Sequence, residues 1–361
     1  MLSTVHLDYD LPEDHIATRP VEPRDAARMM VVHTGGAVEH RFVRDLPEFL
    51  RAGDLLVLNS TRVLPARFIG ERADTRGRVE GLYLRDDADG WDVLLRARRL
   101  REGVRVTLHR EDGKRAGASL LLKARLPDEP GAWRVRVEGG PGESPGQVLE
   151  RIGLTPLPPY ILRARERHEE SIPDEFDRSH YQTVFARDAG SVAAPTAGLH
   201  LTPPLLEALG ARGVETAEVV LHVGTGTFKP VETEFVEQHP MHEEWCFLGE
   251  ATAAAVARAR ARAGRVVAVG TTAARTLETY ANALNGATPG YPVATRLLIT
   301  PGYQWRWVDG LLTNFHLPRS TLMAMVAAKV GGAAPLKSLY AEALNKNYRF
   351  YSYGDAMLIT A

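Results

Sequence analysis

The side chains with the clearest capacity for proton transfer are three histidines and one glutamate: His200, His242, Glu243 and His316. An imidazole changes its charge near neutral pH, so each histidine can act as a general acid or base. Each also has an ordinary interpretation, because a histidine in a loop often only satisfies backbone groups. We take these four residues as the candidates for acid–base catalysis and leave their individual roles open.

The cluster around His242 also has the spacing of a possible zinc site. His239, His242 and Cys246 lie close together in the chain, with Glu243 or Glu244 as further ligands. Structural zinc sites usually show paired Cys or Cys/His motifs, whereas Cys246 is the single cysteine of this chain. We therefore expect no metal, and we place His242 and Glu243 at the rim of an active site. The alternative is a turn whose imidazoles bond to backbone groups.

Two joints between a strand and a loop offer backbone amides and hydroxyls to a ligand. VVAVGTTAARTLET, from Val266, predicts a strand, a turn and a helix start, where amides after Gly270 can meet a polar or anionic group. HVGTGTFKP, from His222, has lysine where a dinucleotide fingerprint needs its third glycine, so a Rossmann NAD site is disfavoured. Such joints are also common without any ligand. The binding residues expected here are Thr225, Gly226, Thr227, Lys229, Gly270, Thr271, Thr272 and Arg275.

Three further loops contribute candidates. APTAGLH, from Ala194, is too poor in apolar residues for a core strand and precedes a helix predicted to start after Thr202. LLTNFHLPRSTLMAMVAA, from Leu311, predicts a strand, a polar joint and a helix, and ligands gather beyond the carboxyl ends of such strands. NSTRVLPARFIG, from Asn59, runs between two predicted domains. The binding residues expected in these loops are Asn59, Arg62, Arg67, Pro195, Thr196, Gly198, Asn314 and Arg319.

The candidate residues lie in a sequence with two kinds of pattern, which predict two kinds of domain. Between residues 66 and 140, six short segments alternate apolar and charged residues with a period of two, and a small antiparallel barrel would close their edges. Outside this region apolar strands alternate with helical segments, which predicts an α/β sheet with helices on its faces. We expect the sheet domain to comprise residues 1–62 and 156–361, with the barrel inserted at 63–155.

Composition fits two ordinary domains. The 361 residues are 44% hydrophobic and 25% charged, which is typical of a globular protein and argues against disorder. No apolar run approaches the ~18 residues that a membrane span needs. The single cysteine and the absence of a signal-peptide pattern at the N-terminus indicate a reducing cytoplasm.

The net charge of −1 argues against a protein coated in positive charge but permits local basic patches. One such patch, with Trp91 nearby as a possible stacking surface, comprises Arg96, Arg98, Arg99, Arg101 and Arg105. The alternative is a solvated strand edge whose basic side chains discourage aggregation.

The order of motifs along the whole chain resembles one family. The motifs are YDLPEDHIATRPVEPRDAARMMVV from Tyr9, GDLLVLNSTRVLPARFIG from Gly53, GSVAAPTAGLHLTPP from Gly190, LHVGTGTFKPV from Leu221, QHPMHEEWC from Gln238, VVAVGTTAARTLET from Val266, LLTNFHLPRSTLMAMVAA from Leu311 and YSYGDAMLI from Tyr351. Together they resemble the S-adenosylmethionine:tRNA ribosyltransferase-isomerases of queuosine biosynthesis. That resemblance implies a six-stranded antiparallel β-barrel joined to an αβα sandwich, in agreement with the pattern above.

The resemblance also implies a reaction. The ribosyl part of S-adenosylmethionine, a consumed substrate, would be transferred to 7-aminomethyl-7-deazaguanine at the tRNA wobble position and isomerised. Epoxyqueuosine-tRNA would form, and adenine and methionine would leave. The sulfonium acidifies the neighbouring C5′ hydrogen, so a base could generate a carbanion that helps expel adenine. The expected partners are tRNA and this donor, with no metal or membrane, and the expected state is a monomer.

Two other functions remain open from the residues alone. An S-adenosylmethionine-dependent RNA methyltransferase would also use α/β joints and a basic surface. A noncatalytic RNA-binding module would use the barrel and consume no donor. The mass of the RNA product and the release of adenine distinguish the three.

Overall fold

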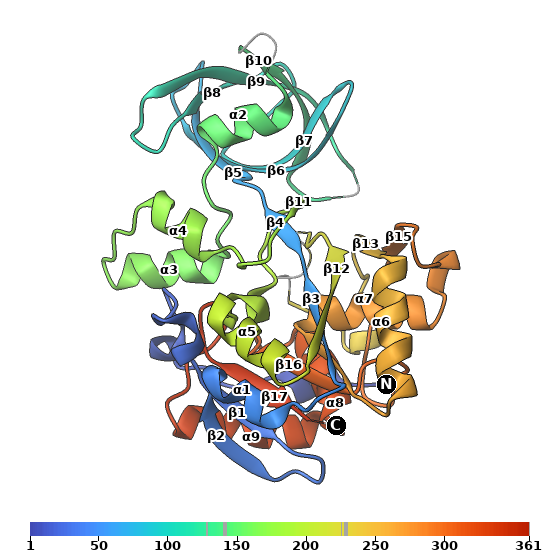
Figure 1. Cartoon of the computed structure of the whole chain (residues 1–361). Coiled ribbons are helices and arrows are strands. Elements are labelled where there is room, and N and C mark those ends of the chain that lie inside the picture. The colour runs from blue at the N-terminus through green and yellow to red at the C-terminus, as the bar shows by residue number, and fades with distance from the viewer. Residues whose placement is uncertain (128, 140–142, 225, 227–229, 361) are drawn as a thin grey trace.

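The computed structural model describes residues 1–127, 129–139, 143–224, 226 and 230–360. The chain forms two bodies: a large sheet with helices on both faces, and a closed six-stranded antiparallel barrel beyond one end of that sheet (Figure 1). The predicted fold, an αβα sandwich with an inserted barrel, is therefore confirmed.

The large sheet has nine strands and is mixed. Four central strands, β12, β3, β14 and β16, run parallel, so their carboxyl ends meet at one edge. In spatial order the strands are β15 (Val293–Thr295), β13 (Glu244–Leu248), β12 (Glu215–Leu221), β3 (Leu55–Asn59), β14 (Val266–Val269), β16 (Gly310–Asn314), β17 (Ala356–Ile359), β1 (Arg28–Val32) and β2 (Val38–Phe42).

The central strands are apolar on both faces because both faces are covered. In β3, Leu55 and Val57 pack into one hydrophobic core, whereas Leu56 and Leu58 pack into the other. Helices α6 (Glu250–Ala261), α7 (Thr271–Ala281), α8 (Thr321–Lys329) and α9 (Ala333–Asn345) contribute to the first core. Helices α1 (Leu46–Phe49) and α5 (Pro203–Ala211) contribute to the second. Continuous apolar runs in strands are the signature of such a covered sheet.

Two helices begin where the sequence predicts. The Thr202 hydroxyl accepts the Leu205 N–H at the start of α5, and the Ser320 hydroxyl accepts the Met323 N–H at the start of α8. Each bond satisfies a backbone donor that the first turn leaves free. No single helix in the described ranges has the length and apolar composition to cross a bilayer. Helices α8 and α9 meet that test only as a pair bent by 102°.

The six segments with a period-two pattern in the sequence form the strands of the closed barrel. Alternate side chains of its strands fill its interior, and α2 (Pro145–Ile152) packs against the same core. Its strands are β5 (Arg67–Arg72), β6 (Arg78–Asp87), β7 (Gly90–Arg96), β8 (Arg105–His109), β9 (Arg115–Arg125) and β10 (Ala132–Glu138).

Trp91 belongs to this interior, which corrects its expected role as a stacking surface. Its side chain is only 3% exposed and meets Tyr83 edge to face at 5.1 Å between ring centroids. The arginines of the proposed basic patch do face solvent.

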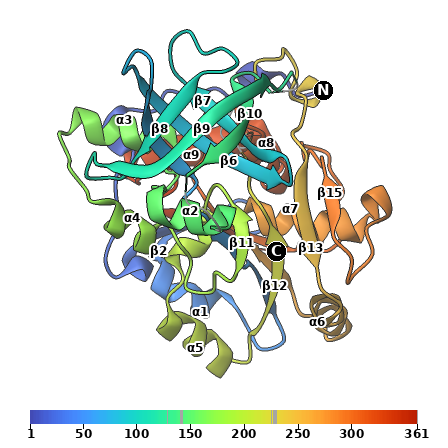
Figure 2. The ribbon, with the colours of Figure 1, turned by 90° about the horizontal axis from the view of Figure 1, so that it is seen from above.

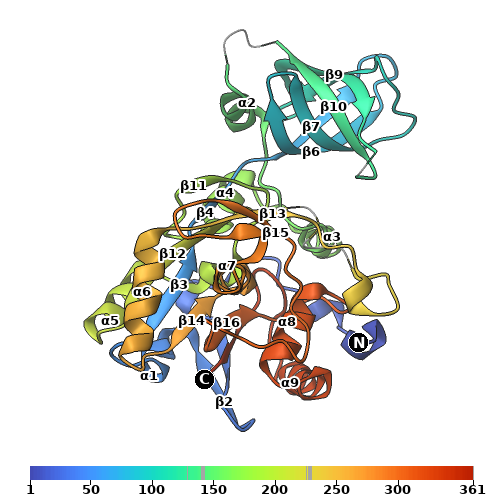
Figure 3. The same cartoon turned by 90° about the vertical axis from the view of Figure 1, so that its right-hand side faces the viewer.

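A short ribbon and two helices join the bodies. The ribbon pairs β4 (Thr61–Val63), which leads into the barrel, with β11 (Asp188–Ser191), which follows the two helices after it. Seen from above, the barrel covers only part of the sandwich and leaves α5 and α6 uncovered (Figure 2). Figure 3 shows β4, β11 and β13 at the end of the sandwich that faces the barrel.

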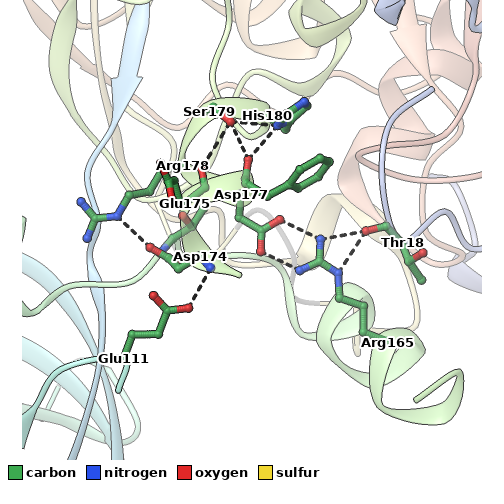
Figure 4. A network of polar contacts seen from close by, with 11 residues as sticks. Thr18, Glu111, Arg165, Asp174, Glu175, Asp177, Arg178, Ser179 and His180 are labelled. Atoms are coloured by element: carbon green, nitrogen blue, oxygen red, sulfur yellow. Dashed lines mark hydrogen bonds and ion pairs between the residues drawn. The ribbon is translucent and has the colours of Figure 1, made fainter. Parts of the chain in front are cut away.

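A polar network around helices α3 (Pro159–Arg167) and α4 (Asp174–His180) holds this junction (Figure 4). The Arg165 guanidinium donates to both carboxylate oxygens of Asp177, at 2.6 and 2.7 Å, and to the Thr18 carbonyl. Glu111, in the barrel, accepts the Asp174 N–H at 2.8 Å. The barrel is thus tied to α4 as well as to the ribbon.

Candidate active site

A cavity that opens to solvent, with about 630 Å³ of empty space including part of that solvent, lies at the carboxyl edge of the parallel strands. It is lined by residues that follow β12, β14 and β16, and by the loop before β17. Ligands of open α/β sheets gather at this edge, because loops from several strands converge there. Of the expected binding residues, the lining includes Pro195, Thr196, Gly270, Thr271, Thr272 and Asn314, and His316 of the acid–base candidates also lines it.

Asn314, the last residue of β16, connects three segments at this cavity. Its Oδ1 accepts the Thr196 hydroxyl at 2.9 Å, and its Nδ2 lies 3.2 Å from both the Tyr351 carbonyl oxygen and His200 Nε2. Because Nδ2 is a donor, His200 Nε2 must be an acceptor here. The amide of Asn314 therefore orients the loop from Thr196 to His200 and the segment before β17.

His200 lies behind the cavity rather than in its lining. It is buried and faces a smaller cavity, together with Arg24 and Arg349. Burial, reinforced by these two guanidiniums, lowers the pKa of His200 to about 3. A neutral histidine that accepts a bond from Asn314 is a positioning group, not one that touches a ligand in the main cavity.

His316 is the imidazole of the main cavity. Its Nε2 lies 2.8 Å from the Thr313 hydroxyl, and its backbone N–H donates to the Tyr340 hydroxyl at 2.9 Å. Nδ1 has no hydrogen bond to any residue that the structure describes. Burial lowers the pKa of His316 to about 4, so the ring is neutral throughout the physiological range. It can accept or donate one hydrogen bond toward a ligand.

These two histidines predict an acid-sensitive fold. Folding lowers the pKa of His200 to about 3 and that of His316 to about 4, against about 6.5 in an unfolded chain. Above pH 6.5 both histidines are neutral in the folded and the unfolded state, and the fold keeps its full stability. As the pH falls below 6.5, the unfolded state binds more protons than the folded state, so the free energy of unfolding decreases. We expect the free energy of unfolding to fall by up to about 1.4 kcal/mol per pH unit for each histidine between pH 6.5 and 4.5.

Urea unfolding at several pH values measures this slope. The His316→Asn variant should remove about half of it, because its side chain does not titrate. An unchanged slope in that variant would show that His316 is not the buried neutral group described here.

Helix α7 directs its N-terminus at the cavity. Gly270 precedes it with φ of +88°, a conformation that side chains other than glycine rarely adopt, and this turn brings the first amides of α7 to the lining. Asn59, buried at the end of β3, donates from Nδ2 to the Thr272 hydroxyl at 3.1 Å. Asn59 itself does not line the cavity, so it positions Thr272. The helix N-terminus favours a negatively charged or polar ligand group.

A second, smaller cavity of about 290 Å³ adjoins the first, since Leu322 lines both. Two expected residues, Gly226 and His242, lie here in contact: a Cβ on Gly226 would meet the His242 ring at 2.3 Å. Arg275 and Glu244 also line it and form a buried ion pair with 2.5 Å between Nη1 and Oε2. Glu244 Oε1 accepts the Gly224 N–H at 3.0 Å. This cavity therefore carries charge, whereas the lining of the main cavity is neutral.

Arg275 retains an unused donor beside this second cavity. Its side chain is 8% exposed, and Nε is buried without a hydrogen-bond partner within the described part of the chain. An unsatisfied buried donor costs about 1–3 kcal/mol, so such groups are usually explained by a partner that binds there.

Several expected residues lie elsewhere. Glu243 is half exposed and pairs with Arg296 at 3.2 Å. Arg319 is exposed, pairs with Asp8 at 2.8 Å and lines neither cavity. Gly198 packs against Phe185, which a Cβ would meet at 2.8 Å.

The two arginines of the junction lie apart from the cavities of the sandwich. Arg62 lines a separate cavity of about 400 Å³ between the ribbon and α4. Arg67 begins barrel strand β5 and bonds through its backbone to Leu154. Thr225, Thr227 and Lys229 lie outside the described residues.

The cysteine of the zinc-like cluster points away from its histidines. His239 and His242 line the second cavity, whereas Cys246 is fully buried in the sandwich core. Burial raises the pKa of the Cys246 thiol to about 12. Within the described ranges, no three His, Cys, Asp or Glu side chains are grouped to hold a metal ion.

Among the lining residues that sequence reasoning did not select for the site are Tyr160, Glu244, Ser320, Tyr351 and Ser352; Glu244 was considered only as a metal ligand. A signal for Glu244 exists. In the strand EWCFL, positions 244, 246 and 248 are buried and position 245 is exposed, so the period-two pattern places Glu244 on the inner face with the core residues. Tyr351 and Ser352 reach the cavity only through long-range packing, which leaves no local pattern.

Comparison with known proteins agrees with this architecture. A family described as "Queuosine biosynthesis protein" matches residues 4–359. An S-adenosylmethionine:tRNA ribosyltransferase-isomerase of Desulfitobacterium hafniense is 46% identical over 355 residues, covering 98% of both chains. One from Gloeobacter violaceus is 50% identical over 354 residues, covering 98% of this chain and 94% of its own.

A solved structure also matches. The S-adenosylmethionine tRNA ribosyltransferase of Thermotoga maritima is 34% identical, with a TM-score of 0.54, and the match covers 98% of this chain and 99% of the other. The family match spans nearly the whole sequence, and both of these relatives bear the same enzyme name. This chain belongs to the queuosine biosynthesis protein family and is a transferase of the ribosyltransferase-isomerase type.

Proposed function

We propose that this enzyme transfers and isomerises the ribosyl part of S-adenosylmethionine onto 7-aminomethyl-7-deazaguanine at the tRNA wobble position. The product is epoxyqueuosine-tRNA, and adenine and methionine are released. The observation that supports this most is the pair of adjoining cavities, one neutral and one charged, at the carboxyl edge of the sheet.

The two cavities match the two ends of the donor. Hydroxyls, amides and aromatic rings line the main cavity, which suits the neutral adenosyl group. The second cavity contains the Arg275–Glu244 pair, and Arg275 Nε is a spare donor for the carboxylate of the methionyl end. The ammonium of that end is complementary to Glu244. The sulfonium then lies between them, near Leu322.

We assign different roles to the four acid–base candidates. His242 lies in the charged cavity and is our proton acceptor for the C5′ hydrogen. His316 is a neutral hydrogen-bonding group for the adenosyl part, and His200 positions Asn314. Glu243 points to solvent, so the buried neighbour Glu244 replaces it in this scheme.

The acceptor RNA reaches the cavities from the side that faces the barrel. Arg62 and Arg67 lie at the junction, where guanidiniums can contact backbone phosphates. We propose residues 63–155 as the barrel domain and residues 1–62 with 156–361 as the catalytic domain. We also propose that the enzyme works as a cytoplasmic monomer without a metal.

The proposed roles predict a difference between two histidine variants. His242→Asn should lower kcat about 10²–10⁴-fold and change the shape of the pH–rate profile, because a general base is lost. His316→Asn should lower kcat less and leave the shape unchanged, because His316 stays neutral above its pKa of about 4. Single-turnover rates measured across a series of pH values, with both substrates saturating, test this. Equal effects of the two variants on the shape would contradict the assignment.

The reaction itself is tested by mass spectrometry of the RNA. A tRNA bearing 7-aminomethyl-7-deazaguanine is incubated with enzyme and S-adenosylmethionine, and free adenine is quantified in parallel. We expect epoxyqueuosine in the tRNA and one adenine per modified base. A methyl group on the RNA without adenine would instead identify a methyltransferase, and unchanged RNA with no adenine would refute the activity.

A further inference from the structure

Three aromatic rings form a parallel row at the edge of the sandwich. The rings of His222 and Trp245 stack with centroids 4.9 Å apart and planes inclined by 12°, and those of Trp245 and Phe247 lie 6.4 Å apart and inclined by 14°. Trp245 is 42% exposed, whereas Trp91 and Trp133 are buried. Folding therefore leaves a large part of this indole in water, where it gains nothing from the core.

The row is held rigidly by its surroundings. The His222 N–H donates to the Trp245 carbonyl at 3.1 Å, and His222 Nδ1 lies 2.8 Å from the Thr61 hydroxyl. On the other side of the imidazole lies Gly190, where a Cβ would come within 2.7–2.9 Å of the ring. Trp245 and Phe247 project from the same face of β13 because they are two residues apart. The ring surface is thus ordered before any partner arrives.

Two members of the row directly neighbour cavity-lining residues in the chain. His222 precedes Val223, which lines the main cavity, and Trp245 follows Glu244, which lines the charged cavity. Strand β13 and the ribbon of β4 and β11 lie at the end of the sandwich that faces the barrel (Figure 3). A molecule that enters from that side meets the strand that presents the exposed indole.

The electrostatic surroundings suit a polyanion with aromatic bases. Arg187 lies just before the strand that contains Gly190, and Arg296 follows Thr295, which pairs with Glu244. Both guanidiniums are exposed and pair with partly exposed carboxylates, at Glu218 and Glu243, which are weak pairs that a phosphate can displace. Burial lowers the pKa of His222 and outweighs the Asp188 carboxylate, which raises it, so the ring supports the indole as a neutral surface.

We propose that Trp245, supported by His222 and Phe247, is a stacking platform for an unpaired nucleobase of the tRNA, a base other than the one that receives the ribosyl group. The choice of RNA as occupant rests on the proposed function, and parallel rings flanked by guanidiniums are the surface on which single-stranded bases stack. Holding a neighbouring base on Trp245 would keep the loop open while the acceptor base enters the cavity.

Binding of an anticodon stem-loop that carries 7-aminomethyl-7-deazaguanine tests the platform. Base–aromatic stacking makes Trp245→Ala expected to raise the Kd about 5- to 150-fold, whereas Trp245→Phe should retain most of the affinity. Tyr291→Ala is the matched control, because it removes another exposed ring that has no ring contact among the described residues. Its Kd should equal that of the wild type, and the Kd for S-adenosylmethionine should be unchanged in all three variants.

A fluorescent base identifies the stacked position. With 2-aminopurine placed in turn at each unpaired loop position, one position should be quenched by the wild type but not by Trp245→Ala. Equal RNA affinity for Trp245→Ala and the wild type would overturn the platform. So would a dimer that Trp245→Ala dissociates while RNA affinity stays constant. If the wild type binds RNA without producing epoxyqueuosine, the proposed function fails, and the Kd ratio still decides the platform.

Discussion

Replacing Arg275 with methionine is expected to lower the free energy of unfolding by about 3–5 kcal/mol and to abolish measurable turnover at ordinary donor concentrations. The substitution keeps an unbranched side chain but leaves Glu244 as a buried carboxylate without its 2.5 Å partner. Removing one member of a buried ion pair has this cost because the other charge remains desolvated. It also removes the spare Nε donor that we assign to the donor's carboxylate.

A double variant separates the structural effect from the functional one. In Glu244→Gln/Arg275→Met neither buried charge remains, so the free energy of unfolding should recover to within about 1 kcal/mol of the wild type. Turnover should stay at least about 100-fold below the wild type, with the loss mainly in kcat/KM for S-adenosylmethionine. Urea unfolding and initial rates measure the two quantities. If activity returned together with stability, the pair would be only structural.

In the wild type, acid lowers the free energy of unfolding through His200. The Asn314→Asp substitution is expected to reverse the sign of this dependence at His200. Asn314 Nδ2 donates toward the Tyr351 carbonyl and His200 Nε2, and a carboxylate can donate to neither. At neutral pH we expect the free energy of unfolding to fall by about 2–4 kcal/mol, because two buried acceptors lose their donor. We also expect kcat to fall at least about 100-fold, since the Tyr351 segment would no longer be held at the cavity, whereas the Thr196 hydroxyl can still donate to the carboxylate.

Acid should partly restore this variant. A carboxylate beside Nε2 favours the imidazolium, so the pKa of His200 should rise from about 3, and the protonated ring can then donate to the introduced carboxylate. Stability gained in this way is present below the raised pKa and is lost above it. The NMR titration of the His200 ring measures the shift. Thr196→Val, which removes only the hydroxyl that donates to Oδ1, should leave that titration unchanged; an unshifted His200 in Asn314→Asp would contradict the network.

The two domains could be predicted because each has a local pattern with one physical cause. Alternation in the segment from Ala66 to Gly140 reflects strands with one wet face, and all six barrel strands fall there. The continuous apolar runs of β3 and β14 reflect a sheet covered on both faces. The helix starts after Thr202 and at Ser320 or Arg319 were predicted from first-turn prolines and apolar spacing, which involve only neighbouring residues, and the structure shows Thr202 and Ser320 as the caps.

The site was less predictable because it is assembled from distant segments. Gly270 to Thr272, Asn314 and His316 were found because they follow strands of the parallel sheet, a rule that does not depend on the partner segments. Glu243 was predicted as a site residue in place of Glu244 because the alternation of buried and exposed positions in EWCFL was not used. That alternation buries Glu244, whereas Glu243 is exposed. Trp91 failed as a stacking surface for a similar reason, because it lies on the inner face of the barrel.

The central claim is that the ribosyl carbons of the donor, and not its methyl group, enter the RNA. A single-turnover reaction with S-adenosylmethionine labelled by ¹⁴C in the ribosyl group and by ³H in the methyl group tests this most directly. The tRNA should retain ¹⁴C without ³H, while ³H should appear in free methionine and unlabelled adenine should be released in equal amount. A tRNA that carries ³H without ¹⁴C would contradict the account and identify methyl transfer instead.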